Sequence, residues 1–327
     1  NFKQNKSRSL GISKSNIKFF NNNIFNIDKL LWDIKKIEIY SENLNYEKIL
    51  EFQDNNKILF SIIKNFELHN YLFSELKKSK LVTFKNKIQN YNSIKDKYKL
   101  IINCDLDNII TKKFFYKKFS KNYDSFAHTA IIDHKKMSNN KIAYQTFTKK
   151  GPIAFLPISD KQTSVVYSVK GFTNINLRNL ISKYNLKYKI SNIKNLDSFE
   201  LKSSDLRVYH HENILAFGDL LHKIHPLAGQ GFNMTIRDIK NFIKIVKERI
   251  NLGLELDSSV CLDFEKQNKH KNFLFAKGID FIYEFFNLEN RINNNIISHS
   301  VKFLGKNKTT NNFLTKIADK GFQFLNY

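Results

Sequence analysis

Glycine and proline are scarce in this 327-residue chain, which contains ten glycines and three prolines. Because these residues permit tight turns and close backbone approach, their positions restrict where the chain can turn sharply. Four of them lie within one 14-residue stretch, at Gly218, Pro226, Gly229 and Gly231. The stretch follows an apolar run over 213–217 and precedes a segment with helical spacing. The pattern predicts a buried strand, a loop that approaches a ligand, and a helix that begins near Asn233.

The residues of this stretch suit a flat cofactor at the carboxyl end of a strand. Asp219 directly follows the predicted strand, where α/β sheets bind ligands, and its carboxylate can accept hydrogen bonds from ligand hydroxyls. The next helix directs its N-terminal N–H groups and positive dipole end toward the same place. This combination favours a ring that gains negative charge on reduction, such as a flavin. An ordinary strand–loop–helix connection is the alternative, and the spacing alone supports both equally.

The rest of the chain alternates between strand-like and helical segments. Alternating or continuous apolar runs predict separate strands over 35–41, 57–63, 81–90 and 99–104. Four successive strand-like runs without helices between them predict an antiparallel sheet, over 126–133, 141–148, 152–158 and 163–169. Leucines four residues apart predict a helix over 66–79, a second helix is expected over 173–185, and the chain is predicted to be mostly helical from about residue 231.

The basic charge of the chain is weak evidence about its partners. Lysine and arginine total 54 against 30 acidic residues, which gives a net charge of +24. Only six of the 54 are arginine, the residue preferred for bidentate phosphate and base contacts. Abundant Lys, Asn, Ile and Phe with little Gly and Pro is what an AT-rich coding sequence yields. We therefore expect no nucleic-acid partner, although charge alone would allow one.

Cysteine and histidine give no pattern of a metal site. Cys104 and Cys261 are the two cysteines, and we expect both to be buried small side chains in a reducing compartment. His210 and His211 have no cysteine or acidic neighbour at a ligand-like spacing, so an edge or loop pair is expected. The apolar runs are shorter than the ~18–20 residues of a membrane-spanning helix.

Residues 218–238 form a longer string, Gly-Asp-x5-His-Pro-Leu-Ala-Gly-Gln-Gly-Phe-Asn-x3-Arg-Asp. This string closely resembles the second flavin-binding motif of FAD-dependent aromatic-ring monooxygenases. Within that group it is most similar to the ubiquinone-biosynthesis hydroxylases, such as 2-polyprenyl-6-methoxyphenol hydroxylase. Four further segments resemble parts of the same enzymes, namely Ser7–Ser13, Asn65–Leu72, Gly151–Pro157 and Asp280–Phe286.

The resemblance implies an α/β fold of the p-hydroxybenzoate-hydroxylase type. It implies a Rossmann-type FAD-binding domain that lacks its first βαβ unit, interleaved with an antiparallel-sheet substrate domain and followed by a C-terminal helical segment. By this comparison the FAD-binding domain comprises 1–33, 61–122 and 207–260. The substrate domain comprises 34–60 and 123–206, and the C-terminal helices comprise 261–327.

The resemblance also implies an activity, the hydroxylation of a polyprenylated phenol in ubiquinone biosynthesis. NAD(P)H would reduce FAD, and O2 would then form a flavin C4a-hydroperoxide that gives one oxygen atom to the ring. Because the flavin carries this chemistry, no catalytic side chain is expected. Two alternatives remain open: another aromatic flavin hydroxylase or prenyl reductase, and a non-catalytic scaffold of a quinone-biosynthesis complex.

The family's flavin contacts map onto ten positions of this chain. They are Arg8, Asp105, Gly218, Asp219, Pro226, Ala228, Gly229, Gln230, Gly231 and Asn233. Asp219 is expected at the ribityl chain, and the residues from Pro226 to Gly231 at the edge of the isoalloxazine ring. For their neighbours we expect structural roles: His225 fixes the loop, Arg237 and Asp238 form a helix pair, and His222 faces solvent.

Two departures from the family pattern bear on activity. No Gly-x-Gly-x-x-Gly occurs in the chain, so the usual cradle for the FAD pyrophosphate is missing. We expect the sequence to be a fragment that begins after that loop; a degenerate gene is the alternative. In addition, Leu106 follows Asp105 where the family has glycine, which places a side chain where the cofactor is expected.

A polyprenylated substrate lies in the bilayer, so the resemblance implies a cytoplasmic protein, peripheral on the inner membrane. The chain offers a candidate contact in its last third, where lysines are interspersed with many phenylalanines. These are Phe273, Phe275, Phe281, Phe285, Phe286, Phe303, Phe313, Phe322 and Phe324. Core packing of these phenylalanines is the alternative for each one of them.

Overall fold

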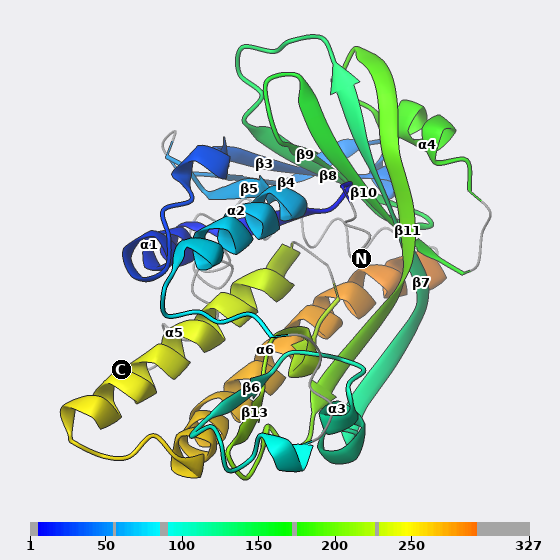
Figure 1. Ribbon diagram of the computed structural model, residues 1–327. Coiled ribbons are helices and arrows are strands. Elements are labelled where there is room, and N and C mark those ends of the chain that lie inside the picture. Colours follow the sequence, from blue (N-terminus) through cyan, green and yellow to red (C-terminus); the bar gives the residue numbers. More distant parts are fainter. Residues whose placement is uncertain (1–5, 55–56, 86–90, 172–174, 226–228, 293–327) are drawn as a thin grey trace. The chain divides into compact units, whose positions relative to one another are not determined.

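The computed structural model describes residues 6–54, 57–85, 91–171, 175–225 and 229–292 (Figure 1). Contacts between residues divide the chain into two compact units. The first unit comprises Asn1–Glu75, Tyr123–Leu201 and Phe281–Tyr327, and the second comprises Leu76–Asn122 and Lys202–Asp280. The sequence assigned residues 1–33 to the same domain as 207–260. That domain assignment stays a prediction.

The first unit contains most of a large sheet, whose strand order is β14-β11-β7-β10-β9-β8-β3-β4. Its strands are β3 (Lys36–Ser41), β4 (Glu47–Gln53), β7 (Lys118–His134), β8 (Ile142–Thr148), β9 (Gly151–Pro157), β10 (Gln162–Lys170) and β11 (Ile190–Leu206). The pairs β7–β10, β10–β9, β9–β8 and β3–β4 are antiparallel, whereas β3 pairs in parallel with β8. The antiparallel sheet predicted from the four strand-like runs is confirmed.

One face of this sheet is covered by α4 (Leu177–Tyr184). Leu177, Ile181 and Tyr184 are buried and recur at the spacing of a helix face. They pack in one cluster with sheet residues such as Phe155 and Tyr167, both fully buried. The helix predicted over 173–185 is therefore present over a shorter range.

A second, three-stranded sheet of the first unit has the order β1-β5-β2 and is antiparallel. Its elements and the following helices are β1 (Ser9–Ser13), α1 (Lys14–Asn23), β2 (Trp32–Ile34), β5 (Phe60–Lys64) and α2 (Asn65–Lys78). The leucine spacing predicted α2 correctly. The short 3-10 helices of the two units are η1 (Asp28–Leu30), η2 (Glu42–Leu44), η3 (Tyr91–Ser93) and η4 (Gly218–Leu220).

The second unit is built around a small sheet with the order β12-β13-β6, in which β13 and β6 are parallel. Its elements are β6 (Ile101–Asn103), α3 (Ile109–Phe114), β12 (His210–His211), β13 (Ile214–Ala216), β14 (His222–Lys223), α5 (Gln230–Asn251) and the part of α6 (Ser258–Ile292) that precedes Phe281. Ile214, Leu215 and Ala216 are fully buried and pack with Phe264 of α6 and Ile245 of α5. The apolar strand predicted over 213–217 is confirmed, and so are the helices after residue 231.

Some expectations about the second unit are wrong. Residues 81–85 form no strand, because this segment has no buried face: Leu81 is 97% exposed and lysines surround it. Residues 86–90 lie outside the described residues. The strand predicted over 99–104 is shorter, and Cys104 is exposed rather than buried because it follows the last residue of β6. Cys261 is buried as expected.

Candidate functional site

The predicted cofactor motifs meet at the carboxyl ends of two parallel strands in the second unit. Ala216 of β13 lies opposite Asn103 of β6, and the Phe217 N–H donates to the Asn103 carbonyl at 2.9 Å. The segments that follow these strands, which carry Asp105 after β6 and Asp219 after β13, therefore leave the same edge of the sheet. In sequence these two aspartates are more than a hundred residues apart.

Gly218 makes the sharp turn at the end of β13. Its φ is +63°, a conformation that glycine adopts without strain, and a Cβ built on it would meet no atom within 4 Å. Asp219 follows with its side chain exposed. Although Cys104 as a residue is exposed, neighbouring atoms partly shield its sulfur from solvent, and this desolvation, together with the negative charge of Asp219, raises the pKa of the thiol. The space beside Gly218 and the exposed carboxylate fit a ligand that carries hydroxyl groups.

The loop after β6 is held by a network of asparagine side chains. Asn108 caps α3, since its Oδ1 accepts from the Thr111 N–H at 2.8 Å, and its Nδ2 donates to Asn103 Oδ1 at 2.8 Å. Asn103 Nδ2 in turn donates to Thr111 Oγ1 at 2.8 Å. The sequence analysis did not single out Asn103, although an asparagine ending a buried strand was the available signal. Asp105 and Leu106 are exposed on this loop, Leu106 by 56%.

The start of α5 presents a buried acceptor. Gly229 is the N-cap residue with a φ of +63°, and Gln230 is only 8% exposed. No hydrogen-bond partner of Gln230 Oε1 is found among the described residues, although that atom is buried. Asn233 is buried and its Nδ2 lies 3.4 Å from the Gly229 carbonyl. Of the remaining predicted contacts, Gly231 lies in the first turn of α5, whereas Pro226 and Ala228 lie outside the described residues.

His222 does not face solvent, which corrects the sequence expectation. It is 2% exposed, and its Nε2 is hydrogen-bonded to Asp238 Oδ2 of α5. Asn272 Nδ2 of α6 donates to the other oxygen of Asp238 at 3.0 Å. The sequence contained a signal for the burial of Asp238 that was missed. Asp238 lies one helical turn after the buried Met234 and is therefore on the buried face of α5.

The two other motif residues, Arg237 and His225, are both buried. Arg237 is buried, with its guanidinium 4.5 Å from the centre of the Phe275 ring of α6. Phe275 is therefore in the core, contrary to its expected place in a membrane contact, whereas Phe273 and Phe281 are 38% and 69% exposed. The side chains of the other phenylalanines in that set lie outside the described part of the chain. His225 is buried, in keeping with a loop-fixing role.

Arg8 belongs to the first unit, immediately before β1. It is exposed, and its guanidinium lies 4.3 Å from the centre of the Phe199 ring of β11. Its carbonyl accepts a hydrogen bond from the Asn65 N–H at 3.0 Å, which ties it to the start of α2. Its contact with a cofactor stays a prediction.

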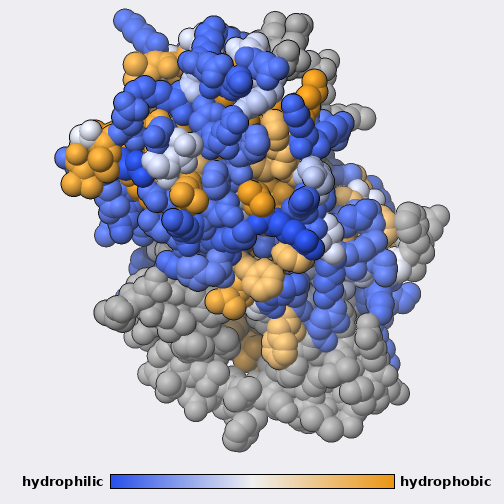
Figure 2. Space-filling view, turned by 90° about the horizontal axis from the view of Figure 1, so that it is seen from below, coloured by the Kyte–Doolittle hydropathy of each residue, from blue (hydrophilic) through white to orange (hydrophobic). Residues whose placement is uncertain are grey.

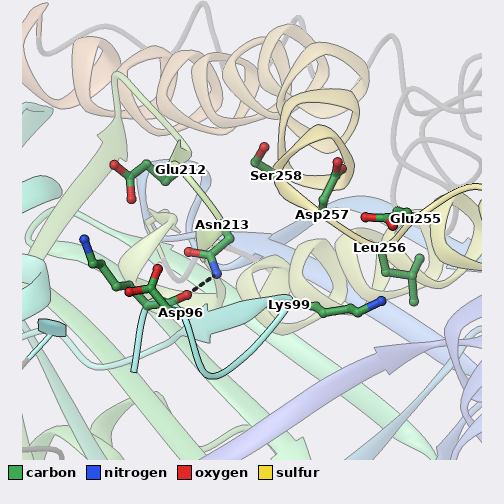
Figure 3. Close-up of a pocket in the computed structure, with 9 residues that line it drawn as sticks. Asp96, Lys99, Glu212, Asn213, Glu255, Leu256, Asp257 and Ser258 are labelled. Atoms are coloured by element: carbon green, nitrogen blue, oxygen red, sulfur yellow. Dashed lines mark hydrogen bonds between the residues drawn. The ribbon is translucent and has the colours of Figure 1, made fainter. Parts of the chain in front are cut away.

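A pocket of about 330 Å³ lies at the opposite, amino ends of the same parallel strands. Lys99 precedes β6 and Asn213 precedes β13, and Asn213 Nδ2 donates to the Lys95 carbonyl at 3.0 Å (Figure 3). The other polar side chains that line the pocket include both positively and negatively charged groups. The pocket is thus separate from the edge that carries the flavin motif. Within the described ranges, no group of three or more metal-ligating side chains occurs, and no helix is both long and apolar enough to span a membrane.

Known proteins similar in sequence include enzymes of ubiquinone biosynthesis. The chain is 24% identical over 233 residues to the ubiquinone biosynthesis monooxygenase COQ6 of Danio rerio, covering 58% of this chain and 48% of that protein. It is 29% identical over 154 residues to the 3-demethoxyubiquinol 3-hydroxylase of Escherichia coli, covering 44% and 39%. The resemblance seen in the motifs is confirmed. The chain spans about half the length of the curated relatives it matches, and no family model matches it.

Solved structures with a similar fold are flavin enzymes. The p-nitrophenol 4-monooxygenase PnpA of Pseudomonas putida aligns with a TM-score of 0.77, covering 98% of this chain and 90% of that chain at 10% identity. HpxO of Klebsiella pneumoniae, in a complex with FAD and uric acid, aligns with a TM-score of 0.73, covering 95% and 87% at 9% identity. These matches confirm the predicted fold class, that of the p-hydroxybenzoate-hydroxylase type.

Proposed function

We propose that this chain is part of an FAD-dependent monooxygenase that hydroxylates the ring of a polyprenylated phenol, using NAD(P)H and O2. The observation that carries the proposal is the meeting of two motif segments, at Asp105 and at Gly218–Asp219, at one sheet edge. The sequence likeness to ubiquinone-biosynthesis hydroxylases supports the substrate class.

The residues at this edge fit the flavin half of FAD. The exposed carboxylates of Asp105 and Asp219 would accept hydrogen bonds from ribityl hydroxyls, and the open space at Gly218 lets the backbone approach them. The buried Oε1 of Gln230 requires an N–H or O–H donor, and a flavin supplies donors of both kinds. Bound FAD would supply the redox and oxygen chemistry of the reaction.

The protein's own contribution would then be to bind, orient and stabilise charge. The first N–H groups of α5 and the helix dipole would favour negative charge on the reduced ring. His222 and Asn272 hold Asp238 and so anchor the helix that carries these groups. No acid–base side chain is required of the protein in this scheme.

Exchanging Asp219 for asparagine is expected to weaken FAD binding by about 10- to 100-fold, the value of a charge-assisted hydrogen bond. The dissociation constant would be measured on the whole gene product by quenching of flavin fluorescence. Asp197→Asn, an exposed change on β11, is the control and should bind as the unchanged protein does. Equal affinity of Asp219→Asn and the control would contradict the assigned role, and a folded whole protein that ignores FAD would reject the proposed function.

A non-catalytic flavin-binding scaffold is the second candidate, and Leu106 favours it. This side chain is 56% exposed on the loop beside the proposed site, where the related enzymes have glycine. Flavin binding without NAD(P)H-dependent oxygen uptake in the presence of a prenylated phenol would support the scaffold. Oxygen uptake and a hydroxylated product would exclude it.

A further inference from the structure

The segment from α3 to the start of β7 exposes apolar and basic side chains together. We call it the 109–119 surface, and its exposed members are Ile109, Lys112, Lys113, Tyr116, Lys117, Lys118 and Phe119. Ile109 is 60%, Tyr116 61% and Phe119 49% exposed. All belong to the second unit.

These apolar side chains are not left over from core packing. The same segment buries Ile110 and Phe115, which are 4% and 3% exposed and belong to the core around β13. The exposed apolar residues are therefore additional to those with which this segment packs into the core. A short surface helix normally carries polar residues on its exposed side. The exposure of Ile109 and Tyr116 therefore indicates a binding partner that accepts apolar groups.

The surface continues onto neighbouring elements. The Arg207 guanidinium lies 4.5 Å from the centre of the Phe119 ring, and the partly exposed Phe273 ring of α6 lies 6.3 Å from it. Figure 2 shows hydrophobic atoms exposed among hydrophilic ones on the face of the molecule seen from below. Arginine stacked on an exposed aromatic ring keeps its charge available to solvent or to an anion.

The charge of this segment has one sign. From Asn108 to Tyr123 the chain contains five lysines and no acidic residue. That is about twice the share of lysine in the whole chain, in which 48 of 327 residues are lysine. The ion pair of Lys112 with Asp107, at 3.5 Å, is solvent-exposed on both sides and therefore weak. The lysines are thus available to an anionic partner.

We propose that the 109–119 surface binds an anionic lipid membrane. Ile109, Tyr116 and Phe119 would enter the interface between headgroups and acyl chains, and the lysines would contact lipid phosphates. Aliphatic Ile109 favours lipid over single-stranded nucleic acid, because bases stack on aromatic rings and not on aliphatic side chains. The proposal rests on the proposed function in one respect, namely that a polyprenylated substrate has to be taken from a bilayer.

The test is co-sedimentation of the whole protein with phosphatidylcholine vesicles, with and without phosphatidylglycerol. A variant with Lys112, Lys113, Lys117 and Lys118 changed to glutamine is compared with a matched control, in which Lys135, Lys136, Lys149 and Lys150 are changed to glutamine. All eight lysines are exposed, and the two variants have the same net charge. Removing the four lysines of the surface should lower binding to phosphatidylglycerol vesicles by at least ~100-fold, since each basic residue near an anionic surface contributes independently. The control should bind within a few-fold of the unchanged protein.

A double change of Tyr116 and Phe119 to serine tests the apolar half of the surface. It should weaken the binding that remains at high salt, where electrostatic attraction is screened. Equal loss in the lysine variant and its control, or no vesicle binding by the unchanged protein, would overturn the proposal. If the unchanged protein bound single-stranded RNA but not vesicles, and only the lysine variant lost this RNA binding, the surface would instead be assigned to nucleic acid. FAD affinity, measured in the same variants, should not change, so failure here is distinguishable from failure of the proposed function.

Discussion

Changing Gly151 to alanine is expected to destabilise the first unit by about 3 kcal/mol or more, through strain and overpacking together. Gly151 begins β9 with a φ of +135°, a region that residues with a Cβ rarely adopt. A Cβ built there would lie 2.1 Å from the carbonyl oxygen of Ser168 in β10. That oxygen belongs to the backbone of a central strand and cannot rotate away, so the two strands would have to separate.

The surrounding contacts make this separation costly. Thr148 pairs with Gly151 across the two-residue turn between β8 and β9, and the Thr148 Oγ1 donates to the Gly151 carbonyl at 2.6 Å. Unfolding in urea can be followed by the fluorescence of Trp32, the single tryptophan, which lies in β2 of the same unit.

Gly171→Ala is the matched control for this change. Gly171 also has a positive φ, +79°, but a Cβ there would meet no atom within 4 Å. We expect it to cost about 1–2 kcal/mol, the backbone term alone. If Gly151→Ala costs no more than Gly171→Ala, the close approach of β9 and β10 is not what requires glycine.

Removing one partner of the His222–Asp238 pair is expected to destabilise the second unit by about 3–5 kcal/mol, because the other charge stays buried. The side chains are 1% and 2% exposed. Asp238→Asn would leave the imidazolium without its counter-charge. His222→Gln would leave the carboxylate with Asn272 as its remaining described partner. Urea unfolding followed by far-UV circular dichroism, with hydrogen exchange of the α5 amides, would measure both.

The double variant and a surface control distinguish the loss of the His222–Asp238 interaction from a general destabilisation of the unit. Because the two residues act as one unit, the combined change should cost less than the sum of the single changes by at least about 1 kcal/mol. On the same helix, Glu248 pairs with Lys244 at 3.6 Å with both side chains more than half exposed. Glu248→Gln should therefore cost less than about 1 kcal/mol. Additive effects of the two single changes would contradict a coupled pair.

The same pair should make stability depend on pH. Burial would lower the pKa of the His222 imidazole, but the charge and hydrogen bond of Asp238, with Asp205 and Asp219 nearby, raise it above 6.5. A histidine with a raised native-state pKa stabilises the fold fully below its unfolded-state pKa and loses that effect as the pH rises through the native value. As the pH rises above about 6.5, the free energy of unfolding of the unchanged protein should therefore fall more than that of His222→Gln. Parallel curves would contradict this.

What could be predicted from the sequence depended on how local the signal is. The strands of the antiparallel sheet and α2 follow from alternation and leucine spacing, which are properties of a few neighbouring residues. The flavin motif was found because its glycines stand out in a chain with few of them. The role of His222 was missed because its partner, Asp238, is sixteen residues away, and only the packing of β14 on α5 brings the two together. For residues 81–85 the predicted strand was wrong, because an apolar run forms a strand only where another element covers it.

The parallel pairing of β3 with β8 has a consequence for synthesis on the ribosome. β8 begins about 100 residues after β3 ends, so at 5–20 residues per second the edge of β3 stays unpaired for roughly 5–20 s. During that interval β3 and β4 can already form their hairpin, in which Lys36 contacts Glu38 at 3.1 Å and Glu51 at 3.0 Å. Charged side chains on a waiting strand discourage pairing with another nascent chain. The charges of this hairpin therefore protect the emerging polypeptide before they contribute to the finished sheet.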